Sequence, residues 1–111
     1  MAAEDFHDRI LLLARRFHAR LEGQLRQLQE TLPAAAVDAD AVAHLRTAFH
    51  AMAGNAPTLG FARIGAEAKR LEALIAPAHE AKRSLTEAER HRIAEGLQSL
   101  AAIRNEENET L

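Results

Sequence analysis

The apolar residues of the first thirty positions recur at intervals of three and four, and this spacing constrains the fold more than any other feature. Residues spaced in this way share one face of an α-helix, whereas a half-buried strand would show strict alternation. The spacing therefore predicts a long helix over residues 4–32, ended by Pro33. The stripe consists of Phe6, Ile10, Leu13, Phe17, Leu21, Leu25, Leu28 and Leu32.

Three further segments carry the same kind of pattern and predict helices over residues 38–56, 61–76 and 86–104. Asp38 or Asp40 is a suitable N-cap for the first of these, because an aspartate oxygen accepts a hydrogen bond from the free backbone N–H groups of the first turn. Residues that weaken or stop helices mark the expected ends and turns, namely Gly54, Asn55, Pro57, Gly60 and Pro77.

The last predicted helix begins with a capping box formed by Thr86 and Glu89. Gly96 is expected to be a mild defect within it, and the polar tail from Asn105 is expected to fray. No stretch alternates as a strand would. Four amphipathic helices with short connections predict an all-α, antiparallel four-helix bundle. Residues 1–111 are expected to form a single domain. The unusual length of the first helix fits such a bundle if its start extends beyond it.

Composition excludes several functional classes. The chain has no cysteine, so it forms no disulfide and no thiolate metal site. Its formal net charge is −2, which is unlike the basic excess of most nucleic-acid-binding domains. The apolar run at residues 10–14 is too short to span a bilayer, and it follows acidic residues, unlike a signal peptide. We therefore expect a cytoplasmic monomer that binds neither nucleic acid nor membrane.

His50 is the candidate functional residue. At about 100° per residue, it lies away from the apolar stripe of its predicted helix, on the flank or the solvent side. Its neighbours on that face are mostly compact, and Gly54, one turn later, has no side chain at all, which favours close approach of another molecule. Imidazole is nucleophilic near neutral pH and forms covalent phosphoryl intermediates. Arg46, Lys69 and Arg70 are candidate sources of positive charge for a phosphoryl group.

The other histidines are expected to be solvated or to lie at the boundary of the core: His7, His18, His44, His79 and His91. A metal-binding bundle is a further hypothesis, because such sites use Glu-x-x-His ligands that project inward. The nearest spacings, Glu4 with His7 and Glu87 with His91, lie near helix ends and off the apolar stripes. We therefore expect no metal site.

The stretch from His50 to Glu72 resembles the histidine-containing phosphotransfer (HPt) domain. The positions that match its motif are His50, Met52, Gly54, Leu59 and Gly60, continued by Ile64, Ala68, Leu71 and Glu72. The resemblance implies a carrier in a two-component phosphorelay that is not itself an enzyme and has no ATP site. The Nε2 atom of His50 would take a phosphoryl group from the aspartyl phosphate of a receiver domain and pass it to another receiver. The partners would be a response-regulator receiver domain, a hybrid histidine kinase, or both. The chain would need no cofactor of its own, because the receiver would supply Mg²⁺.

One motif position departs from the family pattern. The family usually has a lysine three residues after the histidine, and this chain has Ala53. The substitution leaves the stabilisation of the phosphoryl group open, and Arg46 is a candidate to compensate. It also favours an alternative function: a non-catalytic helical module that binds a receiver domain or histidine kinase and modulates it.

Overall fold

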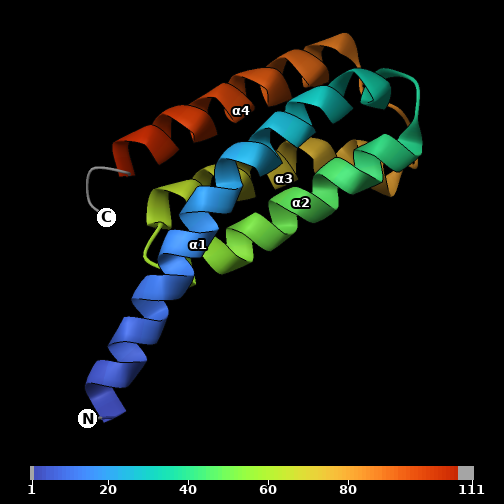
Figure 1. The fold of residues 1–111 in the computed structure, drawn as a ribbon. Coiled ribbons are helices and arrows are strands. Elements are labelled where there is room, and N and C mark those ends of the chain that lie inside the picture. The colour runs from blue at the N-terminus through green and yellow to red at the C-terminus, as the bar shows by residue number, and fades with distance from the viewer. Residues whose placement is uncertain (1, 108–111) are drawn as a thin grey trace.

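The computed structural model describes residues 2–107, with side chains from residue 5 onward. Its elements, in chain order, are α1 (Ala2–Thr31), the short 3₁₀ helix η1 (Leu32–Ala36), α2 (Ala39–Thr58), α3 (Ala62–Glu80) and α4 (Glu87–Glu107). The four long helices pack as a bundle, with no strand in the described part of the chain (Figure 1). The predicted all-α four-helix bundle is therefore confirmed.

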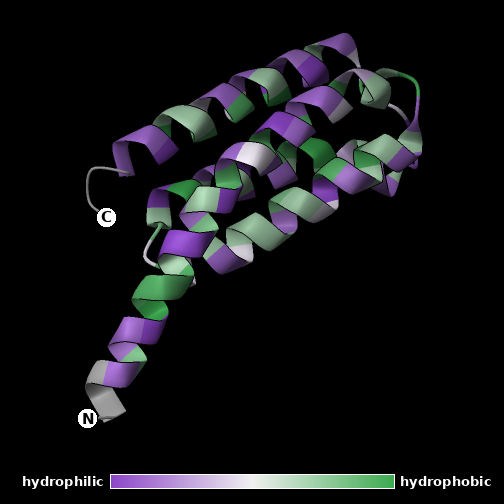
Figure 2. Cartoon of the chain, viewed as in Figure 1, coloured by the Kyte–Doolittle hydropathy of each residue, from purple (hydrophilic) through white to green (hydrophobic). Residues whose placement is uncertain are grey.

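The first part of α1 extends well beyond the other helices, which accommodates the unusual length of this helix (Figure 1). Phe6 is 66% exposed there, and Leu12 and Leu13 are each 47% exposed. Figure 2 shows a hydrophobic band on this projecting part. Farther along the same stripe, Leu21 and Leu28 are fully enclosed by the bundle. One continuous apolar stripe therefore serves as core at one end and as exposed surface at the other.

Two helices continue through prolines that were expected to end them. The helix predicted over residues 61–76 runs to Glu80 through Pro77, and the one predicted over 38–56 runs to Thr58 through Pro57. A proline in the last turns removes only one backbone hydrogen bond. Burial of Ala56 and Ala78 in the core favours keeping those turns helical.

A Schellman motif ends α2 and sets the turn into α3. Gly60 has φ of +93°, a left-handed conformation that glycine adopts without steric cost. The N–H of Phe61 donates to the carbonyl of Ala56 at 2.8 Å, and the N–H of Gly60 donates to that of Pro57 at 3.1 Å. Because Phe61 is itself buried, the motif is anchored in the core, and α3 is directed back along α2.

Two residues expected at the surface or as defects are part of the packed interior. His18 is only 4% exposed, so the expectation that it would be solvated or at the boundary is wrong. Its Nε2 lies 2.9 Å from the carbonyl oxygen of Arg104, whose Nε donates to the carbonyl of His18 at 2.9 Å. Burial is tolerated because Nε2 of the ring and the backbone carbonyl of His18 both have hydrogen-bond partners. Gly96 is also buried, and the absence of a side chain lets Leu71 pack against it. A Cβ at this position would lie 2.9 Å from Cγ of Leu71.

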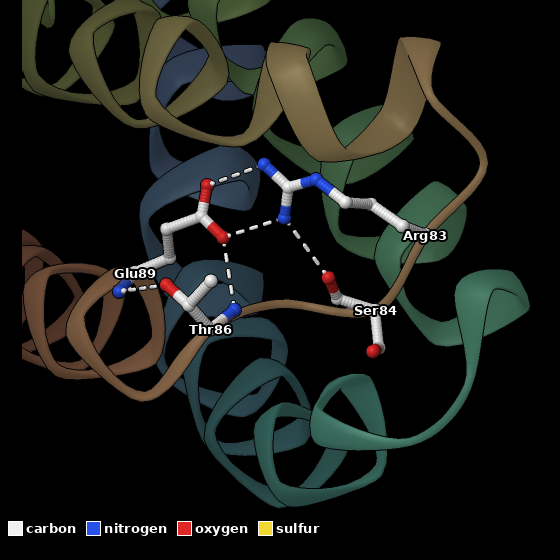
Figure 3. A network of polar contacts seen from close by, with 4 residues as sticks. All are labelled: Arg83, Ser84, Thr86 and Glu89. Carbon is white, nitrogen blue, oxygen red and sulfur yellow. Dashed lines mark hydrogen bonds and ion pairs between the residues drawn. The ribbon is translucent and has the colours of Figure 1, made fainter.

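The capping box at the start of α4 is present and is joined to the preceding loop (Figure 3). The N–H of Glu89 donates to Oγ1 of Thr86 at 3.1 Å, and the N–H of Thr86 donates to Oε1 of Glu89 at 2.9 Å. Arg83 also donates to both carboxylate oxygens of Glu89, at 2.8 and 3.1 Å. The Arg83 hydrogen bonds, followed by that from the Thr86 N–H, lower the pKa of Glu89 from 4.5 to about 2.

At the other end, α4 remains helical through Asn105 to Glu107. Glu106 accepts a hydrogen bond from Arg63 at 2.5 Å. The rest of the tail that was expected to fray lies outside the described residues.

Candidate functional site

His50 projects from α2 toward solvent beside α3, with 63% of its side chain exposed. Phe49 and Met52, on the neighbouring face of the same helix, are 0% and 2% exposed. Their burial fixes the rotation of α2 about its axis. The imidazole is therefore held at the surface by the packing of that neighbouring face, in agreement with the helical spacing.

Glu72 of α3 accepts a hydrogen bond from the imidazole. Its Oε2 lies 2.5 Å from Nδ1 of His50, and its side chain is 21% exposed. A carboxylate can only accept, so Nδ1 carries the proton and the lone pair of a neutral ring is on Nε2. Within the described residues, Nε2 has no hydrogen-bond partner. Glu72 thus holds the ring as the tautomer that presents Nε2 as a nucleophile.

The two helices face each other with matching stripes of side chains. On α2 the stripe contains His50 and Pro57, and on α3 it contains Glu72 and Gly65. A Cβ at Gly65 would lie 2.5 Å from Cγ of Pro57, so the backbones approach closely there. The separations of seven residues on each helix match, as expected for an antiparallel pair. This register places the histidine opposite the glutamate.

Arg46 and Arg70 do not stand free beside the imidazole. Nε of Arg46 lies 3.6 Å from Oε2 of Glu72, the same oxygen that accepts from His50. Arg46 is therefore joined to the histidine through the carboxylate. Arg70 instead donates from two nitrogens to Glu67 on its own helix, so its charge is directed elsewhere.

The remaining predicted site residues differ in their surroundings. Lys69 is exposed on α3, one turn before Glu72. Gly54 is exposed one turn after His50, and a Cβ there would meet no described atom within 4 Å beyond its chain neighbours and the backbone of its own helix. Gly60 contributes through the backbone, because its left-handed conformation ends α2. Ala53 is half-buried on the α2 stripe.

From the sequence, Glu72 was predicted only to match the family motif, without a role at the site. The sequence shows that it lies on the helix after the histidine, and the family pattern includes it. Its contact with His50 depends on the antiparallel register of α2 and α3, which hydrophobic spacing alone does not define.

An apolar groove with a volume of about 430 Å³ runs between α1 and α2. Phe17 of α1 and Met52 of α2 contribute apolar surface, while Arg16 and Arg20 add positive charge. Ala51, the residue after His50, also lines it. His50 does not itself line the groove, because its imidazole points to Glu72 on α3.

The described residues contain no group of three or more His, Cys, Asp or Glu side chains that could hold a metal ion. Within the same residues, no helix is long and apolar enough to cross a membrane.

The fold and site define a class of protein: a helical bundle that presents a nucleophilic imidazole on its surface. A family model described as the Hpt domain matches residues 13–103 of the 111. The chain belongs to the Hpt domain family. Searches of curated proteins and of solved structures found no match. Hpt domains are phosphocarrier modules of two-component phosphorelays, and in general they interact with receiver domains and kinases.

Proposed function

We propose that this protein carries a phosphoryl group on Nε2 of His50 between the aspartates of receiver domains. The observation that carries the proposal is the 2.5 Å hydrogen bond from Nδ1 to Glu72 on an imidazole that is 63% exposed. It leaves the nucleophilic nitrogen at the surface, where a partner protein can reach it. We further propose that the protein works as a monomer in the cytoplasm.

In the transfer step, the Nε2 lone pair attacks the phosphorus of the receiver's aspartyl phosphate. The N–P bond forms while the bond from phosphorus to the aspartate oxygen breaks, and the carboxylate leaves as an anion. The proton stays on Nδ1, so the ring gains positive charge. The Glu72 carboxylate stabilises that charge, and the reverse step returns the phosphoryl group to a receiver. Mg²⁺ belongs to the receiver in this scheme.

The groove between α1 and α2 supports a docking role for the surface beside His50. It combines exposed apolar side chains with Arg16 and Arg20. A receiver domain that carries carboxylates around its phosphorylated aspartate would complement this charge. Association of the receiver with this surface would be faster at low ionic strength, because salt screens the attraction between the two charged surfaces.

The test is phosphoryl transfer from a panel of phosphorylated receiver domains to the purified protein. The label should be acid-labile and base-stable, as expected for phosphohistidine. It should disappear in His50→Gln and persist in His44→Gln, which removes an exposed histidine from another face of α2. A label that persists in His50→Gln would refute the assignment of the site.

A second candidate is a non-catalytic module that binds a receiver domain or kinase and modulates it. Ala53, in place of the usual lysine, is the observation that favours it. On this hypothesis no receiver labels the protein, and His50→Gln binds its partner as well as the wild type does. Binding by calorimetry, measured beside the transfer assay, separates the two functions.

A further inference from the structure

We infer that Lys69 is the side chain that contacts the phosphoryl group once it is on His50. The inference rests on the proposed function and adds to it a phosphoryl-binding residue on a different helix from the histidine. A phosphoryl group brings close to two negative charges at neutral pH. It would form next to the Glu72 carboxylate, which lies 2.5 Å from the other ring nitrogen. Repulsion between these groups creates a need for a nearby cation.

The arginines of α2 and α3 are engaged by carboxylates. Arg46 lies 3.6 Å from the Glu72 carboxylate. Arg70 is bound to Glu67 through two nitrogens, and Arg63 donates to Glu106 at 2.5 Å. These contacts turn each guanidinium toward an acidic side chain. By contrast, no carboxylate of the described residues is paired with Lys69, whose side chain is exposed.

The register of α2 and α3 places Lys69 at the phosphoryl site. The pairs His50 with Glu72 and Pro57 with Gly65 fix the alignment of the two stripes. Position 69 lies between 65 and 72 on α3, just as position 53 lies between 50 and 57 on α2. Because the helices are antiparallel, Lys69 faces the α2 stripe at the level of position 53, one turn from the histidine.

The small residue at position 53 allows this geometry. Ala53 carries only a methyl group, so no long side chain of α2 competes for the space in front of the α3 stripe. A flexible lysine stem can then extend over it toward a group on Nε2. In this chain the positive charge therefore comes from α3, opposite the position where the motif usually has its lysine.

The first experiment needs no receiver domain. Phosphoramidate phosphorylates exposed histidines directly, and the phosphorus NMR signal of phospho-His50 is identified by its absence in His50→Gln. A nearby cation favours the dianionic phosphoryl group, so its measured second pKa should rise by about half a unit in Lys69→Ala. The matched control, Arg70→Ala, removes the same charge from the next residue and should leave that pKa unchanged.

Two rescue variants test whether charge, rather than structure, is responsible. Lys69→Arg should keep the wild-type phosphoryl pKa. The double variant Lys69→Ala with Ala53→Lys should restore it, because the cation returns from the facing helix. An unchanged phosphoryl pKa in Lys69→Ala would overturn the inference. The inference would also be overturned if neither rescue variant restored the wild-type phosphoryl pKa although each kept the helical circular dichroism of the wild type.

Transfer from a phosphorylated receiver provides the second readout. Lys69→Ala should slow it about five-fold, with a weaker salt dependence than the wild type. If no receiver labels the wild type, the proposed function fails, while the phosphoramidate titration still decides the role of Lys69. The two failures are therefore distinguishable.

Discussion

Replacing Glu72 with glutamine tests how far the carboxylate assists phosphoryl transfer. Glutamine keeps the size of the side chain and can still accept from Nδ1 of His50 through its carbonyl oxygen, but it loses the negative charge. A hydrogen bond with a charged partner contributes roughly 1 kcal/mol more than a neutral one. Because His50 is 63% exposed, solvent screening places the effect at or below that value. We therefore expect transfer to slow by about two- to five-fold.

The assay compares initial rates of transfer from one phosphorylated receiver to the wild type, Glu72→Gln and Glu67→Gln. Glu67 is the control because it is also on α3 but is bound to Arg70. Nitrogen NMR of the His50 ring should show the proton on Nδ1 in the neutral wild type. Equal rates for the wild type and Glu72→Gln, or a wild-type ring that carries its proton on Nε2, would refute the reasoning.

Three other predictions concern stability and access. Gly54→Ala should raise the free energy of unfolding by about 0.5–1 kcal/mol in thermal denaturation, since the added methyl group meets no neighbour. The same methyl group should slow phosphoryl transfer because it obstructs the receiver. An undiminished transfer rate would contradict the role of Gly54. Gly96→Ala should lower the free energy of unfolding in urea by about 1–3 kcal/mol, because its Cβ would lie 2.9 Å from Cγ of the buried Leu71. A variant as stable as the wild type would show that the core adapts at no cost. The pKa of Glu89 is lower in the folded state, so the stability it contributes is complete above about pH 4.5 and is lost as the pH falls toward about 2. Urea unfolding across that range should therefore show a smaller loss in Glu89→Gln, and an equal loss would argue against this contribution.

Local chemistry made much of the fold predictable. The stripe in α1, the Asp38 cap and the Thr86–Glu89 capping box all depend on residues within one or two turns of each other. In the structure, the N–H of Asp40 donates to the Asp38 side chain at 2.8 Å, as the cap requires. Such short-range signals define where a helix starts and which face is apolar.

Features that depend on contacts between helices were not predictable in the same way. Histidine is a residue type common at the surface, and the burial of His18 depends on contacts with Arg104, 86 positions away, and with the ring of Phe61. Pro77 would end an isolated helix, but the buried Ala78 keeps the next turn in the core. In both cases, packing outweighs the local preference.

At the candidate site, too, local features were predictable from the sequence and contacts between side chains were not. The motif and the spacing identified His50 and placed it away from the apolar stripe. They did not show that Glu72 would bind its ring or that Arg70 would turn to Glu67. Those contacts depend on the relative register of two helices and on side-chain rotamers, and neither is encoded by hydrophobic periodicity.

The exposure of His50 has a kinetic consequence. On the proposed function, donor and acceptor receivers must reach the same nitrogen on the same surface, so they cannot be bound together. The protein must release one receiver before it meets the other, and the phosphorylated form must persist between the two encounters. Steady-state transfer between two receivers should therefore follow ping-pong kinetics, with parallel lines in a double-reciprocal plot.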